Sequence, residues 1–406
     1  MKKILFSILT ISVLSLPLLA TNPVQTAMPS LSIAPDGRAA GMGDLGVATS
    51  PDLNSQHWNP AKYAFMESKG GITANYTPWL TKLVNDIDLA YLAGYYNMGE
   101  MAGTISGSFT YFSMGTVALV DGFGGTFAEA TPNEWAIDLA YSRKLHEYVS
   151  MAVALRFLYS DLNNGVNSSV SGSAQEMYPA WTMAADVSLY YRQPISLPMG
   201  ESYLGVGLNI SNLGGKMTHD EGLTQNFIPA NFRLGVSYEL PFDDHNSLMA
   251  SVECSKLLVP TYKSKFAINE ETGDALTGQA LQDWYSGVSS PKGWWMSFCD
   301  APGYYNELTG KNVSPLLEEF QEVQWGVGLE YSYNKMFFAR AGYSHENYWK
   351  GNRRYVTLGA GFNYSIFNID FAYCLAVTPS NPLDQTMRFT LGFDLAGIKD
   401  LVNNRK

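Results

Sequence analysis

Cysteine is scarce in this chain of 406 residues, and long hydrophobic runs are scarcer still. The three cysteines, Cys254, Cys299 and Cys374, are odd in number and lack the spacing of metal ligands. They exclude a complete disulfide framework but allow one bridge with a spare thiol. The only long apolar run lies at the extreme N-terminus, which excludes a polytopic helical membrane protein.

Basic residues are also few. Lys and Arg number 26 against 37 Asp and Glu, which gives a net charge of -11 at pH 7. Binding to nucleic acid would need a local basic patch to overcome repulsion from the phosphates, and the sequence shows no such patch. We therefore expect no nucleic acid partner.

The residue types that are abundant in this chain, namely hydrophobic residues, aromatic residues and glycine, are typical of β-strands. Hydrophobic residues make up 46% and the mean hydropathy is -0.08, which excludes intrinsic disorder. Aromatic residues reach 13% and stand beside 37 Gly, a mixture typical of β-strands and interfacial aromatic girdles. One large barrel then explains a length that would otherwise suggest two domains.

Residues 1–20 have the features of a secretory signal peptide. Lys2 and Lys3 precede a short apolar core that is interrupted by Pro17 and ends at Ala20. This pattern predicts export, and a retained N-terminal membrane anchor is the alternative. No cysteine follows the expected cleavage site, which argues against a lipid anchor.

From about residue 71 the sequence alternates with a period of two, in segments of about ten residues, which is the length of a tilted membrane-spanning strand. In residues 149–159, apolar side chains alternate with small or polar ones, so one face is apolar throughout. Fourteen such segments predict an all-β fold, a 14-stranded antiparallel transmembrane β-barrel of the outer-membrane kind. The segments are 71–77, 86–98, 102–114, 134–144, 149–159, 181–192, 202–211, 231–240, 247–256, 323–333, 336–343, 355–364, 367–376 and 386–394.

Short and long connections alternate along the predicted barrel. Short turns fall near residues 144–148 and 334–335, for example, whereas long loops fall near 114–133, 160–179 and 257–322. With the N-terminus in the periplasm, every long loop lies outside the cell and every short turn lies inside, as in known outer-membrane barrels. A soluble sandwich has no reason to keep this alternation.

The strand parity assigns charged side chains of both signs to the barrel interior, because Arg or Lys facing lipid costs about 2–4 kcal/mol at the bilayer midplane. Ion pairs that fill the lumen and a polar transport pathway are the two interpretations, and the first is favoured. The same parity directs Cys254 toward lipid and Cys374 toward the lumen. The inward set is Asp138, Arg156, Asp186, Arg192, Arg233, Glu239, Glu253, Glu330, Asp370 and Arg388.

Motifs that suggest chemistry are weak in this chain. Residues 41–46 match the dinucleotide pattern GxGxxG, but no βαβ unit surrounds them, so these glycines are expected to permit close backbone contacts. The five histidines are scattered and do not indicate a zinc site. Ser344 beside His345 is the only local hint of a nucleophile and its base. We expect no catalytic, cofactor-binding or metal-binding residues and no enzymatic activity.

The segment 257–322 is far longer than an ordinary connection, and loops of that size are usually functional or disordered. It contains an aromatic cluster suited to binding hot spots or to anchors at the membrane surface. Packing of the loop on itself over the barrel mouth is the alternative. Residues 313–320 predict a short helix that starts at Ser314 with Pro315 in its first turn. The candidate partner-binding residues are Trp294, Trp295, Met296, Phe298, Tyr304 and Tyr305.

Residues 35–65, PDGRAAGMGDLGVATSPDLNSQHWNPAKYAF, resemble the N-terminal signature of the PorV family, outer-membrane barrels related to the FadL fatty-acid transporters. The resemblance implies a FadL-like barrel over residues 69–394, a hatch or plug segment over 21–68 and a periplasmic tail over 395–406. The residues that carry it are Arg38, Ala39, Ala40, Gly41, Met42, Gly43, Asn59, Pro60 and Ala61; Arg38, Gly41, Gly43, Asn59 and Pro60 form the expected hatch motif.

The family belongs to the type IX secretion system, so the resemblance implies a cargo shuttle embedded in outer-membrane lipid. Such a shuttle docks beside a giant translocon barrel of the SprA/Sov type, receives cargo through its conserved C-terminal domain and delivers it to a PorU-like sortase. The alternative is a FadL-like transporter of hydrophobic small molecules. A lipid-modifying enzyme, in line with the family's other name LptO, is a third interpretation that would depend on Ser344 and His345.

Overall fold

The computed structural model describes residues 26–82, 84, 86–120, 126–164, 178–220, 224–306, 309–378 and 383–395. The expected signal peptide lies outside these ranges, and so does the expected C-terminal tail apart from residue 395. Within the described ranges, no helix is both long and apolar enough to cross a membrane.

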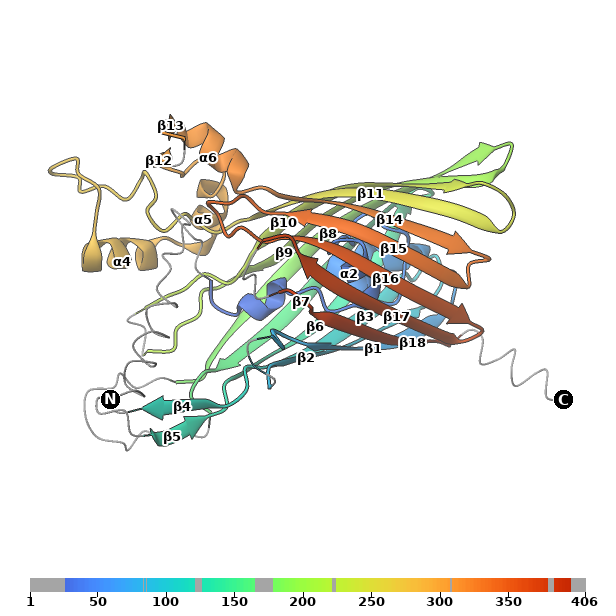
Figure 1. Cartoon of the computed structure of the whole chain (residues 1–406), viewed down its shortest axis with the longest axis horizontal. Coiled ribbons are helices and arrows are strands. Elements are labelled where there is room, and N and C mark those ends of the chain that lie inside the picture. Colours follow the sequence, from blue (N-terminus) through green and yellow to red (C-terminus); the bar gives the residue numbers. More distant parts are fainter. Residues whose placement is uncertain are drawn as a thin grey trace, which may run out of the picture.

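Fourteen antiparallel strands close into one barrel (Figure 1), which confirms the expected number and positions of the strands. The first and last strands close the barrel, with the register running from Gly71 opposite Asp394 to Tyr76 opposite Phe389. The barrel strands, in order, are β1 (Gly70–Pro78), β2 (Asp88–Asn97), β3 (Thr104–Ser113), β6 (Asn133–His146), β7 (Val149–Asp161), β8 (Ala180–Leu197), β9 (Gly200–Gly214), β10 (Asn231–Pro241), β11 (Asn246–Leu257), β14 (Gln324–Tyr333), β15 (Phe337–His345), β16 (Arg354–Tyr364), β17 (Phe367–Ala376) and β18 (Met387–Asp394).

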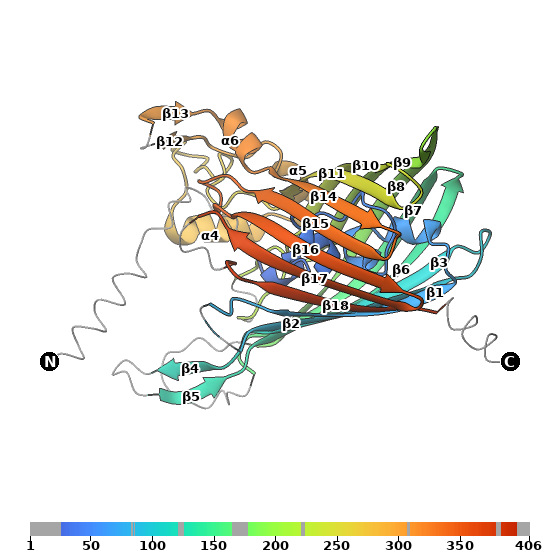
Figure 2. The ribbon, with the colours of Figure 1, turned by 45° about the vertical axis from the view of Figure 1, so that its right-hand side comes forward.

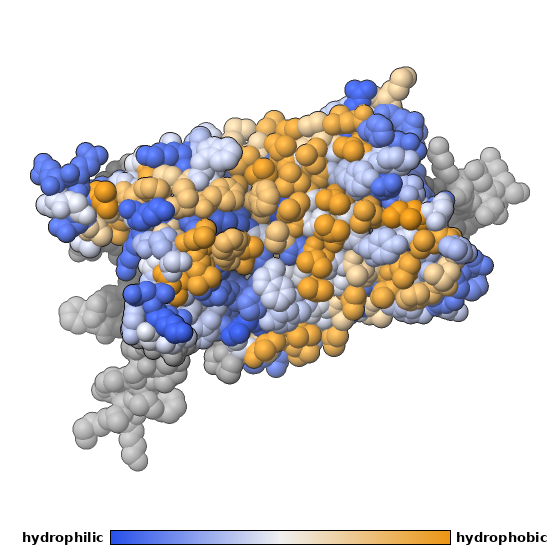
Figure 3. Space-filling view, turned by 90° about the horizontal axis from the view of Figure 1, so that it is seen from above, coloured by the Kyte–Doolittle hydropathy of each residue, from blue (hydrophilic) through white to orange (hydrophobic). Residues whose placement is uncertain are grey.

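Each strand sends one set of side chains to the lumen and the other to the outside, because successive residues of a strand point to opposite faces. In β7, Val153 and Leu155 are exposed on the outer wall, whereas Ala152 and Ala154 are buried against the interior. Figure 3 shows the result, with apolar residues over the middle of the barrel wall and hydrophilic residues gathered at both ends. A polar interior inside an apolar belt is the pattern of an outer-membrane barrel.

Elements outside the barrel gather at one end, where the long loops lie (Figure 1). The β3–β6 loop carries a hairpin of β4 (Val117–Val120) and β5 (Thr126–Ala130), which the sequence had not indicated. The loop over residues 258–323, called the outer platform below, holds one element that was predicted and four that were not. Its elements are α4 (Gly278–Gly287), α5 (Ser290–Met296), β12 (Tyr304–Asn306), β13 (Lys311–Val313) and α6 (Pro315–Gln321).

Helix α6 confirms the predicted start at Ser314. The Ser314 side chain accepts a hydrogen bond from the backbone N–H of Leu317, which caps the helix, and Pro315 occupies the first position. Because this cap is local in sequence, it could be recognised without knowledge of the fold.

Residues 28–65, called the inner segment below, lie within the barrel, where α2 is visible behind the strands in Figure 1 and blue ribbon shows between the strands in Figure 2. The segment contains η1 (Pro29–Ser32), α2 (Gly37–Gly41), α3 (Ser55–Trp58) and η2 (Pro60–Phe65). Helix α2 contacts β15 to β18, and η2 contacts β6, β7 and β8 on the opposite side of the lumen. The inner segment therefore spans the lumen from wall to wall.

The path of the inner segment differs from the expected periplasmic start. The N–H of Ala27 donates to the carbonyl of Phe227 in the long β9–β10 loop at 2.8 Å, so the described chain begins at the outer mouth. It then crosses the lumen and enters β1 at Gly70, on the side of the short turns. The direction of the barrel is as expected, but the chain reaches its first strand from inside the lumen.

Candidate functional site

Arg38 of α2 joins the inner segment to the barrel wall. Its Nε and Nη2 atoms donate to the two carboxylate oxygens of Glu330 on β14, at 2.9 and 2.8 Å. Its Nη1 atom donates to Asp52 Oδ2 at 2.8 Å, and Ser50 accepts two further bonds. All three guanidinium nitrogens are thus bonded, and the paired Glu330 geometry is the strong, bidentate kind. Glu330 also accepts from Arg340, which extends the network along the wall.

A second attachment joins the segment to β11 and β8. The backbone N–H groups of Gly46 and Val47 both donate to Glu253 Oε2 at 3.0 Å. Asn59 donates to the carbonyls of Val47 and Leu189 at 2.9 and 3.0 Å, and its own side chain caps η2. Pro60 follows as the first residue of η2. The hatch-motif residues Asn59 and Pro60 thus lie at the point where the segment turns along the wall.

The glycines of residues 41–46 allow close packing against the wall and within the inner segment, as expected from the lack of a nucleotide-binding context. A Cβ atom on Gly41 would lie 3.0 Å from the Cα atom of Gly359, and one on Gly46 would lie 2.2 Å from the Trp58 ring. Gly43 has a φ of +85°, a left-handed conformation that favours glycine. On the barrel side, a Cβ atom on Gly342 would lie 2.0 Å from the carbonyl carbon of Met42.

The charged interior forms ion pairs, the interpretation favoured from the sequence. Arg156 Nη2 contacts Asp138 at 2.8 Å and Asp186 at 3.0 Å, and Gln56 of the inner segment donates to the other Asp138 oxygen at 2.7 Å. The inward parity is confirmed for Asp138, Arg156, Asp186, Glu253, Glu330, Asp370 and Arg388, which are all buried, whereas Arg192, Arg233 and Glu239 are half-buried.

The cysteines follow the predicted parity, since Cys374 is buried in the interior and Cys254 is half-buried on the outer wall. All three cysteines, including the exposed Cys299, are free thiols, so the bridge that the sequence allowed does not form.

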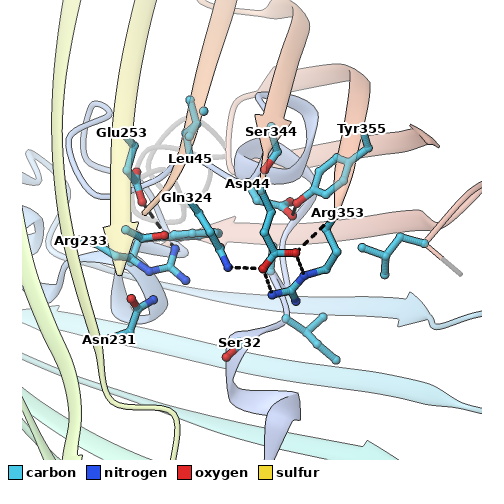
Figure 4. A pocket seen from close by; sticks show the side chains of 18 of the residues that line it. Ser32, Asp44, Leu45, Asn231, Arg233, Glu253, Gln324, Ser344, Arg353 and Tyr355 are labelled. Atoms are coloured by element: carbon cyan, nitrogen blue, oxygen red, sulfur yellow. Dashed lines mark hydrogen bonds and ion pairs between the residues drawn. The ribbon is translucent and has the colours of Figure 1, made fainter. Parts of the chain in front are cut away.

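Two cavities lie on either side of the inner segment and share no lining residue among the described residues. The cavity on the turn side has a volume of about 360 Å³ and is bordered by Arg38, Asp52 and Glu330. The cavity at the outer mouth has a volume of about 250 Å³ (Figure 4). The inner segment and its ion pairs therefore fill the middle of the lumen.

The outer cavity is polar. Arg353 donates two bonds of 2.8 Å to Glu346, which also accepts from Gln324, and the Arg233 guanidinium lies 3.5 Å from Glu253 (Figure 4). Arg388, the third cation among the described residues that line this cavity, lies 3.6 Å from Asp44. Each of the three thus faces a carboxylate, which leaves little net charge to attract an ion of one sign.

Ser344 and His345 do not form a catalytic pair. Ser344 faces the outer cavity, whereas the His345 ring stacks on Trp325 of the outer wall with ring centroids 4.8 Å apart. Adjacent strand residues point to opposite faces, so a hydroxyl and an imidazole in these positions cannot share a proton. This geometry removes the residues on which the enzymatic interpretation depended.

The aromatic cluster of the outer platform divides into packed and exposed members. Met296 packs beside a buried cluster that includes Phe227 and Tyr285, and the Tyr304 ring lies 5.6 Å from Trp349. Trp294 is half-buried. In contrast, Trp295, Phe298 and Tyr305 are exposed, and Trp295 keeps 77% of its surface accessible.

Buried charges fix the platform to the barrel rim. Lys256 at the end of β11 pairs with Glu319 and Glu322, and Lys350 of the β15–β16 loop pairs with Glu318 and Glu322. These contacts join segments about 30 to 60 residues apart, so the sequence alone gave no sign of them.

Asp300 belongs to the same region of the platform. Thr261 donates to both of its carboxylate oxygens, at 2.8 and 3.1 Å. Burial, together with the nearby charges of Glu322 and Glu319, raises the pKa of Asp300 to about 7.

Comparisons with known proteins found solved structures with distant similarity to this chain. The Ralstonia pickettii toluene transporter TbuX is 13% identical, with a TM-score of 0.46 over 88% of this chain and 96% of that chain. The Pseudomonas putida toluene transporter TodX is 12% identical, with a TM-score of 0.47 over 88% and 95%. A Pseudomonas aeruginosa FadL homologue is 12% identical, with a TM-score of 0.40 over 92% and 99%. A search of curated proteins found no match.

The sequence itself matches one family model, described as type IX secretion system protein PorV, over residues 19–264. The matched part includes the whole inner segment and the strands β1 to β11. Together with the closed barrel and its apolar belt, the match identifies an outer-membrane component of secretion or transport. The chain belongs to the PorV family of type IX secretion system proteins.

Proposed function

We propose that this protein is a non-enzymatic shuttle of the type IX secretion system. In this role it binds the translocon barrel, receives cargo through the cargo's conserved C-terminal domain and passes it to the sortase at the cell surface. The observation that carries the proposal is the contrast between the lumen of the barrel and its outer platform. The inner segment fills the lumen, whereas the outer platform presents large exposed side chains on a loop that is fixed to the rim by ion pairs.

Exposed aromatic side chains on a fixed support suit protein recognition. Trp and Tyr dominate binding hot spots because they bury a large area at little cost in conformational entropy. Trp295 and Tyr305 are both exposed. They also lie on a fixed support, because the buried ion pairs of Lys256 and Lys350 hold the platform. The inner segment acts as a plug in this proposal, so that cargo passes beside the barrel and not through it.

The test compares a double variant, Trp295→Ala with Tyr305→Ala, with a matched variant of the barrel wall, Trp181→Ala. Trp181 is 65% exposed, but it lies on β8 and stacks on Phe157 of the wall. The double variant should co-purify with several-fold less translocon or cargo, while the heat-modifiable mobility of the barrel and the behaviour of the Trp181 variant stay unchanged. Equal recovery of partners with all three proteins would refute the proposed surface.

A transporter of hydrophobic small molecules is the second candidate, and the outer cavity of about 250 Å³ is the observation in its favour. The cavity is lined by Arg233, Arg353 and Glu346, which suit a greasy ligand poorly. This function predicts saturable uptake of a hydrophobic compound in cells that express the protein. Uptake that stays linear with concentration would eliminate it.

A further inference from the structure

A groove lies between helix α6 and the outer wall of the barrel. The groove lies at the outer ends of β10 and β11, where Phe232 is the register partner of Lys256 and Leu234 that of Cys254. It has a volume of about 220 Å³. Its apolar lining consists of Phe232 and Cys254 on the wall and Phe298, Leu316, Phe320 and Val323 on the platform.

The charged groups beside the groove are paired with each other. Lys256 stands at an outward position of β11, where a free ammonium would oppose contact with hydrocarbon. Its Nζ atom instead donates to Glu319 at 3.1 Å and to Glu322, and its side chain is only 7% exposed. The groove therefore offers an occupant an apolar surface and no free charge at Lys256.

The floor of the groove continues into the part of the wall that faces lipid. The next outward residue toward the periplasm is Leu234 on β10, after Phe232, and Val252 on β11, after Cys254, and both are exposed on the outer wall. Trp325 and Val327 continue the same surface on β14. The groove thus begins where the apolar belt ends. An occupant that arrives along the wall from the bilayer meets no polar barrier.

The roof of the groove is apolar as well as exposed. Leu316 and Phe320 keep 69% and 67% of their surface accessible, although α6 is held in place by the pairs of Glu319 and Lys256. Exposed apolar residues are costly unless something covers them. A flexible chain lying between the wall and α6 covers both surfaces at once.

We propose that this groove binds an acyl chain of an outer-leaflet lipid, and that the bound chain holds α6 and the outer platform against the membrane surface. The continuity of the groove with the lipid-facing wall selects this occupant over a soluble ligand. The bound chain shields Phe320 and Leu316 on one side and extends the apolar belt upward on the other. This site is independent of the shuttle function, because lipid binding needs no translocon or cargo.

The test uses the full-length protein in nanodiscs that contain a phospholipid with a photoreactive diazirine in its acyl chain. After irradiation, mass spectrometry locates the lipid adducts. Adducts are expected on Phe298 or α6, in addition to the wall residues around Val252. The variant Cys254→Trp fills the groove and should lower the adducts on α6 at least several-fold. The matched variant Val252→Trp, on the wall below the groove, should leave them unchanged.

Adducts confined to the wall would overturn the proposal, and so would adducts on α6 that persist in Cys254→Trp. A second measurement identifies the occupant in the native outer membrane, with a photoreactive amino acid at Leu316. Adducts that carry the mass of a lipid support the site. Adducts to another protein would overturn it and show that a protein covers this face, whatever the outcome of the translocon experiment.

Discussion

At the scale of single residues, Arg38 joins the inner segment to the barrel wall through both carboxylate oxygens of Glu330. The family signature indicated that Arg38 belongs to a hatch motif, but its partner Glu330 is 292 residues away. The partner could not be predicted, because pairing across a barrel depends on strand order and shear as well as on local sequence. The inward direction of Glu330 followed from strand parity alone.

The variant Arg38→Ala should destabilise the protein by about 1–3 kcal/mol, since it removes the bidentate bonds to the buried Glu330 and the bond to the half-buried Asp52, while Arg340 still pairs with Glu330. Urea unfolding of the detergent-solubilised protein measures this change. The matched control is Lys263→Ala on the outer platform, whose side chain is exposed and whose loss should change stability by less than about 0.5 kcal/mol. A small effect of Arg38→Ala would mean that the pairs do not hold the segment.

Asp300 makes the outer platform sensitive to pH. Its pKa rises from 3.8 to about 7 on folding, so the folded platform binds the proton more tightly than the unfolded one. Stability of the platform should therefore fall as the pH rises through this interval. Hydrogen exchange of residues 258–306, corrected for the intrinsic effect of pH, should show more opening at pH 8 than at pH 5. Asp300→Asn should flatten the profile, and an unchanged profile in this variant would contradict the assignment.

At the scale of elements, the strands could be predicted and much of what surrounds them could not. Alternation is strong where one face meets lipid and the other a polar lumen, so segments such as residues 149–159 matched their strands closely. The helices α4 and α5 and the β4–β5 hairpin were missed, because short elements in a long loop are stabilised by tertiary contacts and not by their own periodicity. Helix α6 was the exception, since its cap is local.

The inner segment should keep the ion conductance of the barrel low. In Gly342→Val the added side chain collides with the backbone of Met42, so the segment must move away from β15. We expect a higher single-channel conductance in planar bilayers than that of the wild type. Gly287→Ala is the matched control, because a Cβ atom there meets nothing within 4 Å. Conductance that stays at the wild-type level in a folded Gly342→Val barrel would contradict the role of the segment as a plug.

At the scale of the whole molecule, the inner segment occupies the lumen of the barrel, and the outer platform lies at the outer end of the strands. The long loops, the platform and the exposed aromatic residues lie at one end of the strands, and the short turns lie at the other (Figure 1). The sequence predicted this polarity from the alternation of loop lengths. It did not predict which of the six aromatic-cluster residues stay exposed, because that depends on how Met296 and Tyr304 pack against distant loops.

The most direct test of the shuttle account is a mild-detergent pull-down of the tagged protein from its native outer membrane, with mass spectrometry of everything retained. The account predicts recovery of a very large barrel, or of secreted proteins that share a C-terminal domain. Recovery of this protein with neither a very large barrel nor such secreted proteins would contradict the shuttle.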